Sequence, residues 1–170
     1  MTNVPRSRRS SASLVLAVVL GGERYGIPVE YVDEVLPALP FESLPECPAY
    51  VRGVVLVRDQ LIPVIDAAQR LLLKNHQPPA EPHIVCLRID GQLLGLQVDE
   101  ALELVEVAKA VRLQLGEAAT NEAFCSGISE LDGEVIRMLD PMQLHPGAWS
   151  SSDMDVVNGR RGGPQTEHAP

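Results

Sequence analysis

The two halves of this 170-residue chain repeat one pattern of apolar runs and turns, which restricts the fold more than any single motif does. Residues 20–29 match residues 89–98 at an offset of 69 positions, and Val15–Leu20 falls on Ile84–Ile89. Each segment places Gly-Gly or Asp-Gly between two apolar runs, which is typical of a tight β-hairpin. The run before Gly21 also has signal-peptide character, but its counterpart lies mid-chain, so we predict a buried first strand.

A second set of matching segments has an offset of 74 positions. Gly53-Val54 corresponds to Gly127-Ile128, and residues 61–66 correspond to residues 135–140. Turns at Arg58-Asp59-Gln60 and Asp132-Gly133 interrupt the apolar runs of the two copies. Several short strands in each half predict a mainly all-β chain of small antiparallel barrels, with few and short helices.

The boundaries of the folded part follow from composition. Residues 1–12 and 150–170 lack apolar periodicity, so we predict a disordered arm and a disordered tail. Residues 13–149 form the predicted domain, with subdomains at about 13–80 and 81–149 and a proline-rich connector at 74–82. A crossover of the terminal segments between the two subdomains stays open.

Charge and cysteine content exclude several classes of function. The formal net charge of −9 disfavours a phosphate-backbone partner such as nucleic acid. Cys47, Cys86 and Cys125 are odd in number and form no CxxC pair, which favours a reducing compartment over a disulfide framework. Apolar runs fall short of the roughly 18 residues that span a bilayer.

Candidate chemical groups each have a structural interpretation. Asp66 and Asp140 occupy matching positions and could form a two-carboxylate hydrolase site, but each also precedes a short helix with Gln three residues later, as an N-cap does. Cys47, His76, His83 and Cys86 match no compact metal-ligand spacing, and we expect solvated histidines beside the connector. Phosphate-binding glycine motifs do not occur. We therefore expect no catalysis, no cofactor and no metal.

A possible binding surface lies in residues 28–36. Val29, Val32, Val35 and Leu36 have helical spacing before Pro37, which predicts a short amphipathic helix. Such a stripe either seals one end of a barrel or faces outward as a groove for a partner helix.

The ordered set of segments resembles the CheW family, the adaptors of bacterial chemotaxis arrays, over roughly residues 14–144. The resemblance is carried by residues 23–27 and 32–35, by 50–58 and 62–66, and in the second half by 94–99 and 127–140. It implies two SH3-like five-stranded barrels side by side. It also implies a non-catalytic, cytoplasmic coupler, recruited to membrane-associated receptor arrays, that joins a chemoreceptor tip to the regulatory domain of a CheA-type histidine kinase.

The resemblance further implies which residues contact partners. Val32, Glu34 and Val35 lie in the segment implicated in partner contacts, and Gly53 and Arg58 flank the family's central strand. Asp59 stands where the family usually has Gly, so we expect the turn to differ or Asp59 to pair with Arg58. This departure leaves open a variant adaptor of a twitching-motility or other chemosensory system. An adaptor fragment of the CheV type would need a receiver domain, for which the residues after Leu144 are too few.

Overall fold

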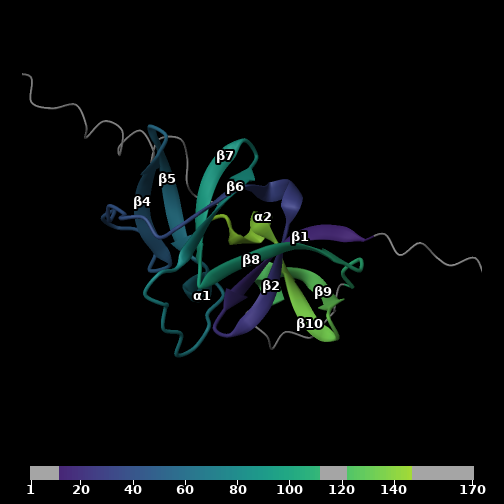
Figure 1. The fold of residues 1–170 in the computed structure, drawn as a ribbon. Coiled ribbons are helices and arrows are strands. Elements are labelled where there is room, and N and C mark those ends of the chain that lie inside the picture. The colour runs from purple at the N-terminus through teal and green to yellow at the C-terminus, as the bar shows by residue number, and fades with distance from the viewer. Residues whose placement is uncertain (1–11, 112–121, 147–170) are drawn as a thin grey trace, which may run out of the picture.

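The computed structural model describes residues 12–111 and 122–146 of the chain. Within these residues, strands form two five-stranded sheets that lie side by side (Figure 1). The strands are β1 (Ser13–Leu20), β2 (Glu23–Pro28), β3 (Val32–Leu36), β4 (Val51–Val57), β5 (Gln60–Asp66), β6 (His83–Ile89), β7 (Gln92–Val98), β8 (Glu100–Val107), β9 (Cys125–Leu131) and β10 (Glu134–Leu139). The short helices are η1 (Val29–Tyr31), α1 (Ala67–Arg70), η2 (Glu122–Phe124) and α2 (Pro141–Leu144). The mainly all-β, two-sheet architecture with few short helices is confirmed, while the predicted tail and residues 1–11 of the predicted arm lie outside the described residues.

Each sheet combines strands from both halves of the sequence. Sheet A has the order β8-β1-β2-β10-β9, and sheet B has the order β3-β6-β7-β5-β4. When β1–β5 are taken as one copy of the repeat and β6–β10 as the other, the two orders correspond strand for strand. Each copy therefore gives its first two strands to one sheet and its last three to the other. A division of the chain near residue 80 does not coincide with the division between the sheets.

Two further contacts close the sheets into barrels. Glu42, beyond the end of β3, exchanges both backbone hydrogen bonds with Val54 of β4, at 2.8 and 2.9 Å. Val111, beyond the end of β8, does the same with Ile128 of β9, at 2.8 and 3.0 Å. These segments connect the two edge strands of sheet B and of sheet A, respectively. Glu42 corresponds to Val111 at the offset of 69, and Val54 corresponds to Ile128 at the offset of 74. The two copies of the repeat therefore close their barrels with the corresponding pair of residues.

The predicted hairpins are present, but pairing between the copies corrects the antiparallel prediction. The two-residue tips at 21–22, 58–59, 90–91 and 132–133 all have positive φ angles, as twisted hairpins require. Strand β2 pairs with β10 in parallel, and β5 pairs with β7 in parallel. Both parallel pairs join strands of different copies. Hairpin motifs indicate pairing between consecutive strands only, so they could not predict these pairs.

The helix predicted over residues 28–36 is wrong. One turn of 3-10 helix, η1, is followed directly by strand β3, whose residues alternate between half-buried and exposed positions. The periodicity misled because the exposed face of β3 carries the apolar Val35 while the inner face carries the charged Glu34. Apolar spacing therefore did not follow the faces of the strand.

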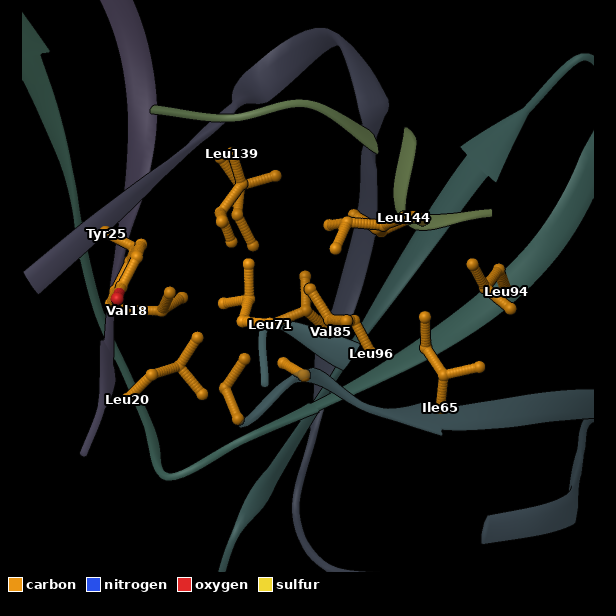
Figure 2. Packing of buried hydrophobic residues seen from close by; sticks show 14 of the residues in the cluster. Val18, Leu20, Tyr25, Ile65, Leu71, Val85, Leu94, Leu96, Leu139 and Leu144 are labelled. Carbon is orange, nitrogen blue, oxygen red and sulfur yellow. The ribbon is translucent and has the colours of Figure 1, made fainter. Parts of the chain in front are cut away.

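The largest apolar cluster lies between the two sheets. It joins Leu16, Val18 and Leu20 of β1 to Val85 and Leu87 of β6, together with residues of β2, β4, β5, β7, β10 and the short helices. Figure 2 shows ten of these residues labelled, including Leu71 and Leu144 at the helices. We call this cluster the shared core.

Each sheet also has a smaller core of its own. Val15 of β1 packs with Val107, Ile136 and Met138 within sheet A, while its neighbour Leu16 belongs to the shared core. Val55, Ile62, Val64, Ile84 and Cys86 form the matching cluster of sheet B. Strand β1 is thus buried on both faces, which explains a continuous apolar run that could be mistaken for a signal sequence. No helix within the described residues is long and apolar enough to cross a membrane.

Candidate functional site

Five of the six predicted partner-binding residues lie in β3 and in the β4–β5 turn. Val32, at the start of β3, is half-buried and packs against the shared core. Val35, on the opposite face of β3, keeps 41% of its surface exposed. Residues 58 and 59 form the exposed turn. Strands β3 and β4 are the two edges of sheet B, so these residues gather where the barrel closes.

A salt bridge connects two of the predicted residues directly. The Arg58 Nη2 donates to the Glu34 Oε2 at 2.7 Å, and the Arg58 side chain is 77% exposed while that of Glu34 is 20% exposed. An exposed pair of this kind contributes roughly 0 to 1 kcal/mol to stability. Its main effect is geometric, because it draws the guanidinium of the turn toward strand β3.

The turn at Arg58 and Asp59 has the same backbone conformation as the matching hairpin of the second copy. Arg58 has a φ angle of 46° and Asp59 one of 64°, so both residues are left-handed, like Asp132 at 55° and Gly133 at 81° in the matching hairpin. The charge of Arg58 pairs with Glu34 rather than with Asp59. The expected Arg58–Asp59 pair is therefore wrong, while a difference from the family's turn stays a prediction. Asp tolerates this conformation better than most side chains do, because its short polar group can bond locally.

Gly53 is buried and supports the closure of the barrel. Its φ angle is +138°, and a Cβ atom there would lie 2.1 Å from the carbonyl oxygen of Glu42. Residue 42 is the partner of Val54 in the closing bridge. Gly53 thus permits a backbone approach that a side chain would block.

A second ion pair on the same edge was not predicted. Arg88 of β6 donates through Nε at 3.2 Å and Nη2 at 3.0 Å to the Asp33 Oδ1 of β3. The β3–β6 pairing is not a hairpin, so no local turn signal indicates that these residues meet. The two ion pairs make this edge of sheet B densely charged.

Cys86 lies beneath that charged edge. It pairs with Glu34 in the strand register and is fully buried. Burial, followed by the nearby carboxylates of Glu34 and Asp33, raises the pKa of the Cys86 thiol from 9.0 to about 11. The thiol stays protonated near neutral pH and is a poor nucleophile or metal ligand.

The two matched aspartates are helix caps. The Asp66 Oδ1 accepts from the Gln69 backbone N–H at 3.1 Å, and the Asp140 Oδ1 accepts from that of Met142 at 3.0 Å. Pro141 occupies the first turn of α2, as predicted. Capping accounts for both carboxylates, and the two-carboxylate hydrolase is not favoured.

The histidines near the connector are not solvated as expected. The His76 side chain is 9% exposed, and its Nε2 lies 2.7 Å from the Asp99 Oδ1. Asp99 also accepts from the Gly21 N–H at 2.8 Å, and the His83 Nδ1 accepts from the Ala101 N–H at 2.8 Å. Both histidines therefore hold, through hydrogen bonds, the segment where the chain passes from β7 of sheet B to β8 of sheet A. The described residues include no group of three or more His, Cys, Asp or Glu placed to hold a metal ion.

The fold and this edge define a class of protein, namely a duplicated double barrel whose candidate site is a surface of β3 and the β4–β5 turn. The CheW-like domain family matches residues 14–146 of the chain. This match spans most of the sequence, and the chain belongs to the CheW-like domain family.

Curated relatives and a solved structure agree with this assignment. The chain is 23% identical over 148 residues to the chemotaxis protein CheW of Rhizobium meliloti (strain 1021), covering 86% of this chain and 96% of the relative. It is 26% identical over 128 residues to a probable chemotaxis protein CheW of Rhizobium etli, covering 74% and 83%. The crystal structure of the scaffolding protein TtCheW from Thermoanaerobacter tengcongensis superposes with a TM-score of 0.72 at 25% identity, covering 79% of this chain and 93% of that one.

Proposed function

We propose that this chain is a non-catalytic adaptor that couples the cytoplasmic tip of a chemoreceptor to a CheA-type histidine kinase in a chemosensory array. The observation that carries the proposal is the family match over residues 14–146, which covers both barrels. The names of its relatives, as chemotaxis proteins and a scaffolding protein, support the same role. In this proposal the chain acts in the cytoplasm, is recruited to membrane-associated arrays, and needs neither cofactor nor metal.

The proposed partner surface consists of Val32, Glu34, Val35, Arg58 and Asp59. Val35 offers an exposed apolar anchor, and Arg58 carries donors able to bind carboxylates or backbone carbonyls. Gly53 acts indirectly, because it is buried and holds the closing bridge. Asp59 is left-handed like Gly133 in the matching hairpin, and a variant array is not favoured.

A pull-down against receptor tip and kinase tests the proposal. Arg58→Glu places an anion beside Glu34 and is expected to leave the circular dichroism spectrum unchanged while binding weakens. Val35→Asp tests the apolar part of the surface in the same way, because Val35 is 41% exposed, whereas Val32 packs against the shared core. Arg137→Glu is the matched control, since Arg137 pairs with Glu23 within sheet A, away from this edge.

The charge-swapped double variant sharpens the test. Glu34→Arg with Arg58→Glu restores an ion pair of reversed polarity. If the partner contacts Arg58 itself, the double variant should bind as poorly as Arg58→Glu. Wild-type binding by both Arg58→Glu and Val35→Asp would contradict the choice of surface.

A further inference from the structure

Both copies of the repeat build the same local unit behind the site. In the first copy, the Tyr50 carbonyl oxygen accepts from the Asp66 N–H at 2.7 Å, and Asp66 caps α1. In the second copy, the Phe124 carbonyl oxygen accepts from the Asp140 N–H at 2.8 Å, and Asp140 caps α2. Each aromatic residue is thereby fixed to the start of its own helix.

Arg70 connects these two units. It is the last residue of α1, and its guanidinium carbon lies 4.4 Å from the Tyr50 ring centroid and 4.7 Å from that of Phe124. Its Nε and Nη2 donate to the carbonyl oxygens of Leu144 and Gln143 at the end of α2, both at 3.3 Å. One side chain therefore contacts an aromatic ring of each copy and the helix end of the second copy.

The connection has no symmetric counterpart. The position in α2 that matches Arg70 is Leu144, which is fully buried in the shared core. The apolar side chain of Leu144 cannot form hydrogen bonds or cation–π contacts equivalent to those of Arg70. Both copies keep the aromatic residue, its hydrogen bond to the Asp N–H and the helix cap. Arg70 is the feature of these units in which the two copies differ.

Most of the remaining contact between the barrels is apolar, and a hydrogen bond from the Ala101 N–H of β8 to the His83 Nδ1 of β6, at 2.8 Å, also joins them. Burial of Val, Leu and Ile side chains is strongly stabilising but carries little directional preference. A guanidinium is planar and donates along fixed directions, and stacking on two rings further restricts its plane. Arg70 therefore adds an orientation-dependent constraint to a joint that is otherwise held mainly by non-directional packing.

We propose that Arg70 is a positioning residue that fixes the relative orientation of the two barrels. Its loss is expected to change the angle between the two barrels, while the strand exchange and the shared core keep them in one structural unit. Any partner that contacts both barrels then loses affinity, a consequence that rests on the proposed adaptor function. The orientation itself does not depend on that function.

Residual dipolar couplings of backbone amides test the orientation with no partner present. In the wild-type chain, the couplings of sheets A and B are expected to fit one alignment tensor. In Arg70→Leu, each sheet should still fit its own tensor well, but the principal axes of the two tensors should differ by more than the fitting error. Arg70→Lys keeps the charge and one donor group and should shift the axes less than Arg70→Leu does.

Arg137→Leu is the matched control, because it removes an arginine whose partner Glu23 lies in the same sheet. It should keep one common tensor. A common tensor for Arg70→Leu, equal to that of the wild type, would overturn the proposal. If Arg70→Leu does not fold, Arg70→Gln takes its place, with the same two outcomes. Failure of the wild type to bind receptor tip or kinase would refute the adaptor function and leave this result standing.

Discussion

Replacing Gly53 by alanine should open the closure of sheet B. The added Cβ would lie 2.1 Å from the Glu42 carbonyl oxygen and 2.8 Å from its carbonyl carbon, both backbone atoms that cannot rotate away. The segment at Glu42 must move, and the two hydrogen bonds to Val54, at 2.8 and 2.9 Å, are the contacts that it breaks. The substitution therefore acts on the barrel seam next to the proposed partner surface.

The expected loss of stability has two parts. Two backbone hydrogen bonds contribute about 0.5 to 1.5 kcal/mol each. The φ angle of +138° costs an L-residue about 1 to 3 kcal/mol more. Together these values give a decrease of about 2 to 6 kcal/mol in the free energy of unfolding. Gly22→Ala is the control, because Gly22 has a φ of +81° with no atom within 4 Å, so only a strain of about 1 to 2 kcal/mol applies.

Urea unfolding followed by circular dichroism measures both variants. Amide hydrogen exchange locates the effect, since the N–H groups of Glu42 and Val54 should lose protection in Gly53→Ala and keep it in Gly22→Ala. A Gly53→Ala variant no less stable than Gly22→Ala, with both amides still protected, would refute the steric argument. If such a variant still lost partner binding, the partner would have to contact residue 53 directly, and the burial of Gly53 disfavours such a contact.

Three further outcomes are expected. Asp59→Gly should raise the free energy of unfolding by about 1 kcal/mol, because Asp59 has a φ of 64°; a decrease in urea unfolding would contradict this. The pKa of Cys86 is raised to about 11, so above pH 9 the folded chain keeps a proton that the unfolded chain releases. The free energy of unfolding should therefore fall between pH 9 and 11, by up to about 1.4 kcal/mol per pH unit. Urea unfolding at several pH values should show that the free energy of unfolding declines less steeply with pH in Cys86→Ala than in the wild type. Equal slopes in the two proteins would count against Cys86 as the group that titrates. Asp66→Ala and Asp140→Ala should each cost about 1 kcal/mol in thermal or urea unfolding without weakening partner binding, whereas a lost hydrolytic activity would revive the two-carboxylate interpretation.

The local parts of the fold could be predicted from the sequence. Gly21-Gly22 and Asp90-Gly91 need positive φ angles, and a tight turn between apolar runs determines which two strands are neighbours. The helix caps were predictable for the same reason, since Asp66 and Asp140 act within three residues of themselves. Interactions of short range leave a signal in consecutive residues.

Pairings between distant strands leave no such signal. The contact of Asp33 with Arg88 depends on the register of β3 against β6, and the exchange of strands between copies depends on β2 meeting β10. The family resemblance indicated that residues 34 and 58 matter, but their salt bridge follows only from the closed barrel. The helix predicted over residues 28–36 failed where a charged residue faces inward and an apolar one outward. These features arise from tertiary packing, which overrides local periodicity.

The exchange of strands makes the two barrels depend on each other for their integrity. Sheet A without the second copy would consist of β1 and β2 alone, and a single two-stranded hairpin is marginally stable at best. Sheet B without the first copy would likewise retain only β6 and β7. The shared core adds the largest set of buried side chains at the place where both copies meet. Neither barrel can therefore unfold while leaving the other complete, and surfaces on the two barrels are held in one structural unit. Such an arrangement suits the proposed adaptor, whose two partners would be held in a fixed relation.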